Sequence, residues 1–422
     1  MAVLRLHRKT LFIIGGMLSI LLLSACGGGG GSSSPKPTGA NQTTDTGTTQ
    51  TPNTDTTQTQ NPGSANFVAG IFQPSSVFKD SCGTPRTSTT SETFPDMQGS
   101  FEDEGYWLRS WSNDTYLWYD EIQDRDPGLY ASSAAGVTEY FDLLKTEATT
   151  PSGNPKDRFH FTSDTAEYVA RMQQGITFGY GAAYKLISSS APRELVIVLV
   201  NENSPAADAG LQRGARIVTV DGVDLINGSD TDTLNAGLWP NQINEDHNFE
   251  VLDPGATERR KIAMTSAQID SDAVPETRII DTDSGKVGYL LFTDHILTAE
   301  QKLVDAVTQM RNANVTDLVL DLRYNQGGFL YLANQMSYMI AGSGVSGQTF
   351  SSLQFNQKNP GVNPVTGGAV SADAFLTTTT ENATPAGAAL PTLELPQPRV
   401  FVLTTSSTCS ASEAIINGLR GA

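Results

Sequence analysis

The chain has 422 residues and a formal net charge of −18 at pH 7, with 45 Asp and Glu against 27 Lys and Arg. An acidic surface repels the phosphate backbone, so the composition excludes a protein that binds nucleic acid through a basic face. The four histidines are scattered without the spacing of metal ligands, so neither a metal nor another cofactor is expected.

The first 26 residues have the pattern of a secretory signal peptide. Basic residues precede an apolar run over residues 11–23, which is shorter than the roughly 20 residues of a membrane span. The Leu-Ser-Ala-Cys sequence that closes the run resembles the bacterial lipobox, which implies that Cys26 becomes the lipidated first residue of the mature protein. Gly27 follows it and favours the outer membrane. We therefore expect a lipid-anchored protein of the bacterial cell envelope, facing the periplasm or the exterior.

Two segments follow the signal. Residues 27–64 have almost no apolar side chain, which predicts a disordered Gly/Ser/Thr/Gln tether. Residues 65–174 hold three of the four tryptophans, and the aromatic spacing within residues 106–111 and 116–119 predicts amphipathic helices with an inward aromatic face. We expect a small N-terminal helical domain here.

Residues 175–268 change to short apolar strands separated by turns. Residues 195–200 indicate a strand, residues 203–211 a short capped helix, and residues 215–222 a strand that ends in an Asp-Gly turn. The phrase SPAADAGLQRGARIVTVDGVDL resembles the PDZ domains of bacterial envelope proteases. That resemblance implies a loop whose backbone amides receive a peptide's terminal carboxylate while the peptide adds to a sheet edge. A plain glycine-rich turn is the alternative. The loop residues are Phe178, Gly179, Tyr180, Gly181 and Ala182.

Residues 269–422 alternate strand and helix, which predicts an α/β core. Thr298 and Gln301 have capping-box spacing at the start of one helix. Residues 343–397 are rich in Gly, Ser, Thr and Pro and predict a long excursion over the surface. The predicted strands are residues 287–292, 318–322 and 400–403, and the predicted helices are residues 298–311, 330–340 and 414–419.

Two polar segments follow predicted strands, where α/β sheets place their sites. DLRYNQGG ends in Gly327 and Gly328, whose bare backbone lets an amide approach a substrate carbonyl. TCSASE opens a helix, so the positive end of the helix dipole lies beside Ser410. A tight turn at the glycines and a helix cap at Ser410 are the simpler alternatives.

Together with the PDZ phrase, these segments follow the order of the C-terminal processing peptidases, also called tail-specific proteases, and the chain after about residue 100 resembles that family. The resemblance implies an α/β, crotonase-like serine protease core with an inserted PDZ domain and an N-terminal helical domain. It implies that Ser410 is the nucleophile and that backbone amides of Gly327, Gly328 and Ala411 form the oxyanion hole. The expected activity is serine endopeptidase cleavage, through an acyl-enzyme, of proteins or peptides with exposed carboxyl termini.

The chain departs from the family pattern at several places. Gln326 replaces a proline, and Cys409 replaces a small residue before the nucleophile. In the family a lysine about two dozen residues after the serine is the general base, which lies past the last residue given. We therefore expect a truncated copy in which residues 1–422 alone are inactive. A Ser-His-Asp triad with His295 and Asp321 is disfavoured, because no spacing links either residue to Ser410.

Two other functions stay open. The first is a tethered, non-catalytic PDZ protein that captures peptides and keeps the protease core as a scaffold. The second, less favoured, is a structural lipoprotein without a peptide site. A disulfide between Cys82 and Cys409 is also open, since an oxidising envelope permits it. The sequence does not indicate which substrates are cut or whether subunits associate.

Overall fold

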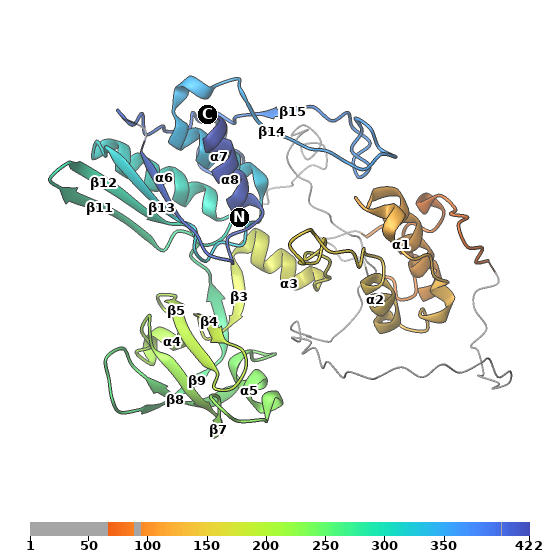
Figure 1. Cartoon of the computed structure of the whole chain (residues 1–422), viewed down its shortest axis with the longest axis horizontal. Coiled ribbons are helices and arrows are strands. Elements are labelled where there is room, and N and C mark those ends of the chain that lie inside the picture. Colours follow the sequence, from red (N-terminus) through yellow and green to blue (C-terminus); the bar gives the residue numbers. More distant parts are fainter. Residues whose placement is uncertain (1–65, 88–93, 398) are drawn as a thin grey trace, which may run out of the picture. The chain divides into compact units, whose positions relative to one another are not determined.

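The computed structural model describes residues 66–87, 94–397 and 399–422 (Figure 1). Its contacts divide them into two compact units, residues 166–352 with 372–422 and residues 66–165 with 353–371. The predicted signal peptide, the tether and Cys26 lie outside the described residues. Within the described ranges, every helix is too short or too polar to cross a bilayer.

The unit of residues 66–165 and 353–371 is built around helix α1 (Phe101–Thr115), which packs on α2 (Ala134–Asp142). Ser100 caps α1, and the carboxylate of Asp103 accepts from the Ser100 amide at 2.8 Å. The two helices and the following turn share an apolar core, made of Leu108, Val137, Tyr140 and Leu144. The short elements here are β1 (Ser81–Cys82), β2 (Met97–Gln98) and 3-10 turns at Ser75–Val77, Tyr119–Glu121 and Pro127–Leu129.

The helix predicted over residues 116–119 is wrong. α1 ends at Thr115, and Tyr116 has extended backbone with φ −65° and ψ 136°. Tertiary contacts hold Tyr116 outside the helix, because its hydroxyl donates to Asp157 at 2.7 Å and accepts from the Thr146 amide at 3.1 Å. These partners lie 30 or more residues away in sequence, so local spacing does not reveal them.

Part of the predicted surface excursion belongs to this unit. Asn356 Nδ2 donates to the carbonyl oxygens of Asp114 and Tyr116, both at 2.9 Å. Lys358 Nζ donates to the carbonyl oxygen of Asn113 at 2.8 Å. The excursion therefore caps the carboxyl end of α1, whose last carbonyls lack helical partners.

In the other unit, an antiparallel sheet has the strand order β4-β5-β6-β8-β9, with β7 paired to β6. Within the described residues β4 pairs on one side only, so it is an edge strand. The predicted Asp-Gly turn is confirmed, because Asp221 and Gly222 both have positive φ, at 48° and 82°, as a type I′ turn requires. The elements are β4 (Ala182–Ser188), β5 (Glu194–Val200), α4 (Pro205–Asp208), β6 (Arg216–Val220), β7 (Val223–Asp224), α5 (Thr231–Leu238), β8 (Asp246–Leu252) and β9 (Arg260–Thr265).

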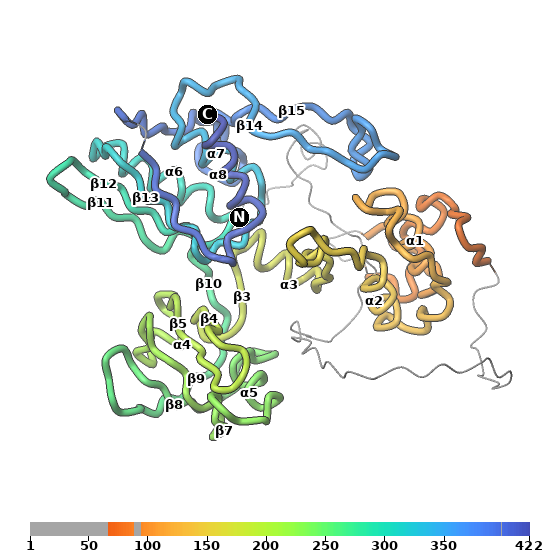
Figure 2. Tube along the Cα trace, in the orientation of Figure 1, coloured from red at the N-terminus to blue at the C-terminus, as the bar shows by residue number. Residues whose placement is uncertain are grey.

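The chain enters and leaves this sheet at one place. Strand β3 (Ile176–Gly179) arrives from α3 (Thr165–Val169) through a π-helical turn at Ala170–Gln174. β3 then pairs antiparallel with β10 (Ala267–Asp270), so the two connecting segments run side by side (Figure 2).

A second sheet has the strand order β11-β12-β13-β16. Strands β12, β13 and β16 are parallel, so their carboxyl ends meet at one edge of the sheet. The parallel strands need crossover connections, which helices α6 and α7 supply. The elements are β11 (Glu276–Thr282), β12 (Gly285–Leu291), α6 (Ala299–Asn312), β13 (Asp317–Asp321), α7 (Leu330–Ala341), a 3-10 turn at Ser343–Val345, β14 (Thr349–Ser352), β15 (Ala372–Ala374), β16 (Val400–Leu403) and α8 (Ala411–Gly421).

Two details of this core differ from the sequence prediction. The capping box at Thr298 does not form, because Thr298 has helical backbone with φ −67° and ψ −9°, and its side chain makes no cap bond. Gln301 instead accepts from the Thr384 amide at 2.8 Å. The excursion also contributes to the interior, since Phe375 and Leu390 are buried and the amide of Thr380 donates to the buried Glu300 at 2.7 Å.

Candidate active site and peptide-binding loop

The predicted site residues gather where the parallel strands end. His295 follows β12, the glycine pair follows β13, and Ser410 follows β16. Two hydroxyls tie the second and third of these segments together: Thr405 Oγ1 donates to the Arg323 carbonyl at 2.5 Å, and Thr408 Oγ1 donates to the Leu322 carbonyl at 2.8 Å. The parallel sheet therefore brings three distant parts of the sequence to one edge.

Ser410 is exposed and is the N-cap residue of α8, and its backbone is unusual for a cap. A helix cap normally has extended backbone, whereas Ser410 has φ 55° and ψ −122°. A positive φ is strained for a residue with a Cβ, and such strain concentrates at functional sites. Glu413 Oε2 accepts from the Ser410 amide at 3.2 Å and helps to hold this conformation. Ser410 is thus both a helix cap and a serine presented on a strained turn.

The glycine pair lies directly against this turn. Gly327 and Gly328 have φ of 102° and 132°, which a residue with a side chain rarely adopts. A Cβ added to Gly327 would lie 2.6 Å from the Ser410 Cβ and 2.9 Å from the Ala411 amide nitrogen. A Cβ on Gly328 would lie 2.4 Å from the His295 carbonyl oxygen. Close approach, rather than a turn alone, requires glycine at both positions.

The oxyanion assignment needs one correction. The Gly327 amide is already used, because it donates to Asn325 Oδ1 at 2.9 Å. The amides of Gly328 and Ala411 have no acceptor in the described part of the chain, and Gly328 is exposed. These two amides can therefore stabilise an oxyanion beside Ser410, and Gly327 cannot.

His295 and Asp321 do not form a triad with Ser410. The Asp321 carboxylate is bound by Arg323 Nε at 2.9 Å and by the Tyr289 hydroxyl at 2.8 Å. Burial opposes its charge, but these hydrogen bonds hold the pKa of Asp321 below its usual range. His295 is completely buried and its Nδ1 bonds Asn325 Oδ1 at 2.8 Å, so burial lowers the pKa of His295 to about 4. Sequence spacing missed the role of Asn325.

No lysine or histidine within the described ranges hydrogen-bonds to Ser410. Lys185 Nζ lies 3.4 Å from the hydroxyl of Ser407, which is on the same turn as Ser410. Cys409 keeps its thiol, and its Sγ lies 3.2 Å from the Gln326 carbonyl oxygen. The Cys82–Cys409 disulfide that the sequence left open is therefore not formed.

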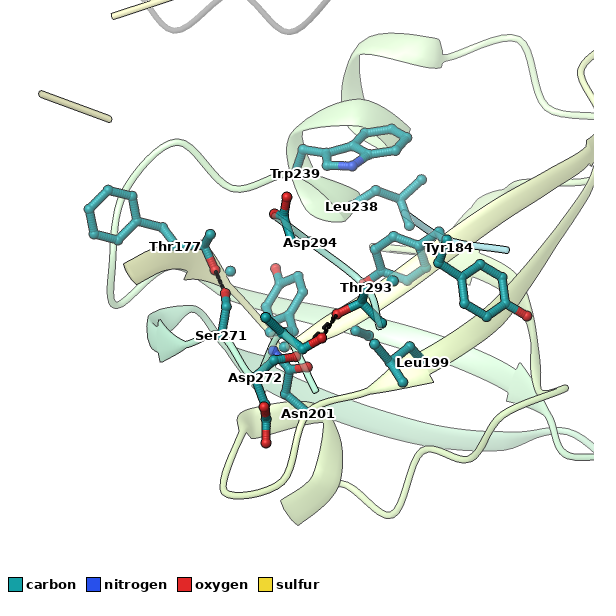
Figure 3. Close-up of a pocket in the computed structure, with 18 of the residues that line it drawn as sticks. Thr177, Tyr184, Leu199, Asn201, Leu238, Trp239, Ser271, Asp272, Thr293 and Asp294 are labelled. Carbon is teal, nitrogen blue, oxygen red and sulfur yellow. Dashed lines mark hydrogen bonds between the residues drawn. The ribbon is translucent and has the colours of Figure 1, made fainter. Parts of the chain in front are cut away.

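The loop predicted to bind carboxylates lines a cavity of about 340 Å³ (Figure 3). Gly179 and Gly181 have φ of 132° and 74°, and the amides of Tyr180 and Gly181 have no acceptor among the described residues. The Tyr180 side chain is buried in the core, where its hydroxyl donates to the Gly237 carbonyl at 3.0 Å. The lining also includes the apolar side chains of Leu199, Leu238 and Trp239. Polar residues that follow β10 and β12, among them Asp272 and Asp294, line it as well.

A strained serine turn at the end of a parallel strand, packed against a glycine pair and close to two amides that lack acceptors among the described residues, has the features of a serine hydrolase site in an α/β fold. Comparison with known proteins agrees. Residues 286–422 match the model of Peptidase family S41, and residues 196–236 match that of the PDZ domain.

Three similar proteins illustrate the match. A carboxyl-terminal-processing protease of Synechocystis sp. is 27% identical over 155 residues, covering 36% of this chain and 35% of that protein. The chloroplastic carboxyl-terminal-processing peptidase 3 of Arabidopsis thaliana is 29% identical over 161 residues, covering 34% and 30%. A solved S41 protease structure from Bacteroides fragilis has 22% identity and a TM-score of 0.46, covering 78% and 77%.

The matches give the chain an S41 peptidase domain and a PDZ domain, and they support the carboxyl-terminal processing peptidase family expected from the sequence. The strands and helices of the structure confirm the α/β core expected from the sequence. The chain spans about a third of the length of the curated relatives it matches.

Proposed function

We propose that this protein is a serine endopeptidase of the bacterial envelope that binds the carboxyl-terminal tail of a substrate protein on its PDZ domain and cleaves through an acyl-enzyme at Ser410. One observation carries the proposal: Ser410 has a strained φ of 55°, packs against the Gly327–Gly328 pair, and is followed by the Ala411 amide, which like that of Gly328 has no acceptor among the described residues.

The chemistry follows from that placement. Ser410 Oγ attacks the peptide carbonyl carbon and forms a C–O bond, and the electron pair of the C=O bond moves to the carbonyl oxygen. The Gly328 and Ala411 amides donate to this oxyanion. The C–N bond then breaks, the amine leaves with a proton, and water hydrolyses the ester. The Ser410 proton needs an acceptor, which the family resemblance implies is a lysine.

Substrate recognition is proposed for the loop of residues 178–182 and the edge strand β4. Among the described residues the amides of Tyr180 and Gly181 have no acceptor, which suits a carboxylate, and β4 is an edge strand with which an extended peptide can pair. Leu238 and Trp239 at the end of α5 then offer an apolar surface to the last side chains of the tail.

A peptide boronic acid tests the nucleophile without requiring turnover. Its trigonal boron accepts the serine oxygen, with the proton released to buffer, and the tetrahedral adduct mimics the oxyanion. Boron NMR and mass spectrometry of the full chain should show an adduct on Ser410. Ser410→Ala should abolish the adduct, and Ser407→Ala, on the same turn, should retain it.

An adduct that persists in Ser410→Ala would contradict the assignment. If the unmutated chain forms no adduct while still binding tail peptides, the non-catalytic PDZ protein is the better function. That alternative is favoured by one observation, the lack of a base bonded to Ser410 among the described residues.

Anchoring is a separate proposal. The lipobox-like sequence supports a diacylated Cys26 in the outer membrane. Cys26→Ser should release the protein from the membrane fraction, whereas an equal amount in the membrane pellet would contradict the anchor.

A further inference from the structure

We infer that His295 is a positioning residue of the oxyanion hole, which orients the Gly327–Gly328 peptide so that the Gly328 amide faces the reacting carbonyl. This inference rests on the proposed function. His295 touches neither substrate nor Ser410 in the proposal, and it acts through Asn325 and the glycine backbone.

Three hydrogen bonds place His295 around the glycine pair. Its amide donates to the Gly327 carbonyl oxygen at 3.1 Å, and its own carbonyl accepts from the Phe329 amide at 2.9 Å. Its ring Nδ1 bonds Asn325 Oδ1 at 2.8 Å. His295 and Gly328 form a parallel bridge, so the backbone of His295 runs along the pair.

The planar peptide between Gly327 and Gly328 fixes the direction of the Gly328 N–H. In a trans peptide the C=O and the following N–H point in opposite directions. Because the Gly327 carbonyl points at the His295 amide, the Gly328 N–H must point away from it. That N–H is the donor without an acceptor in the described chain, so His295 determines where the free donor is aimed.

Asn325 connects the His295 ring to both halves of the site. Its Oδ1 accepts from the Gly327 amide as well as from the ring, and its Nδ2 donates to the Phe292 carbonyl at 3.1 Å. Its backbone carbonyl accepts from the buried Ser412 Oγ at 3.1 Å, in the first turn of α8. A shift of Asn325 would therefore move the glycine loop relative to the Ser410 turn.

Stability alone does not explain a histidine here. Since Asn325 Oδ1 is an acceptor, Nδ1 carries the proton and Nε2 is a bare acceptor. Nε2 is buried and has no partner within the described residues, which destabilises the fold. An apolar side chain of similar size would avoid that defect, but it would remove one of the two bonds that hold Asn325 Oδ1 beside the Gly327 amide. We therefore assign the role of the ring to the bond that it donates to Asn325.

Two variants of the full chain test this inference. His295→Leu removes both ring nitrogens at similar size, and His295→Asn keeps an amide donor near the Nδ1 position. For each, affinity for the peptide boronic acid, affinity for the matching peptide with a free carboxylate, and melting temperature are measured. Nitrogen NMR of the unmutated ring should show the proton on Nδ1.

We expect His295→Leu to weaken boronate binding at least about tenfold, with tail-peptide affinity and melting temperature held or raised. His295→Asn should recover most of the boronate affinity. Unchanged boronate binding in His295→Leu would overturn the inference, and so would a parallel fall of all three measurements, which marks a structural role. Absence of a boronate adduct in the unmutated chain would overturn the proposed function itself.

Discussion

A side chain on Gly327 would place its Cβ 2.6 Å from the Cβ of Ser410, although the two residues are separated by more than 80 positions in sequence. The glycine is therefore matched to the serine turn, and the contact makes the two loops a single site. Both residues also have positive φ, 102° at Gly327 and 55° at Ser410.

Gly327→Ala should disrupt the site through this clash. We expect boronate affinity to fall by roughly 100-fold, the loss typical of a displaced oxyanion donor. Gly347→Ala is the matched control, because Gly347 also has a positive φ, 76°, but nothing lies within 4 Å of the added Cβ. Titration with the peptide boronic acid gives the affinity of each variant for it. Equal affinities in the two variants would mean that the Gly327 contact does not matter.

Ser412→Ala should weaken folding more than adduct formation. Ser412 is fully buried, and its hydroxyl satisfies the Asn325 carbonyl, so its loss should reduce the free energy of unfolding by about 1–2 kcal/mol. Urea unfolding measures the change, with the exposed Ser346→Ala as a control. A stability equal to that of the unmutated chain would show that this buried bond contributes nothing net.

His295 should make the fold sensitive to acid. Its folded-state pKa is about 4, against about 6.5 for an unfolded histidine. Between these values the unfolded chain binds a proton that the folded chain does not, so stability falls as pH drops from about 6.5 to about 4. The shift corresponds to about 3 kcal/mol. Unfolding free energies across this range should fall less steeply in His295→Leu, and parallel curves would contradict the assignment.

Peptides with a free carboxylate should bind the full chain more tightly than amidated ones. The reason is that the amides of Tyr180 and Gly181 have no acceptor in the part of the chain that the structure describes. Gly181→Ala should weaken binding, because its Cβ would lie 2.3 Å from the Ser204 Cβ, whereas Gly210→Ala meets nothing within 4 Å. Fluorescence anisotropy with a labelled tail peptide gives the affinities. Identical binding of acid and amide would count against a carboxylate site.

The sequence by itself predicted the family, the order of the domains and the proposed nucleophile. Local chemistry carries these features: the Asp-Gly turn at residues 221–222 needs two residues that tolerate positive φ, and continuous apolar runs define the buried parallel strands. A serine between a strand and a helix is likewise visible in a short window around Ser410.

Only the tertiary structure decided which amides are free and what holds them. The Gly327 amide looked equivalent to that of Gly328 until the Asn325 side chain was seen to occupy it. His295 lies 30 residues before Asn325 and joins it only because parallel strands end at the same edge. Tyr116 likewise lies outside the helix predicted for it, because its hydroxyl donates to the distant Asp157. Hydrogen bonds between separate segments depend on how strands are stacked in space, and no local spacing in a single sequence encodes that arrangement.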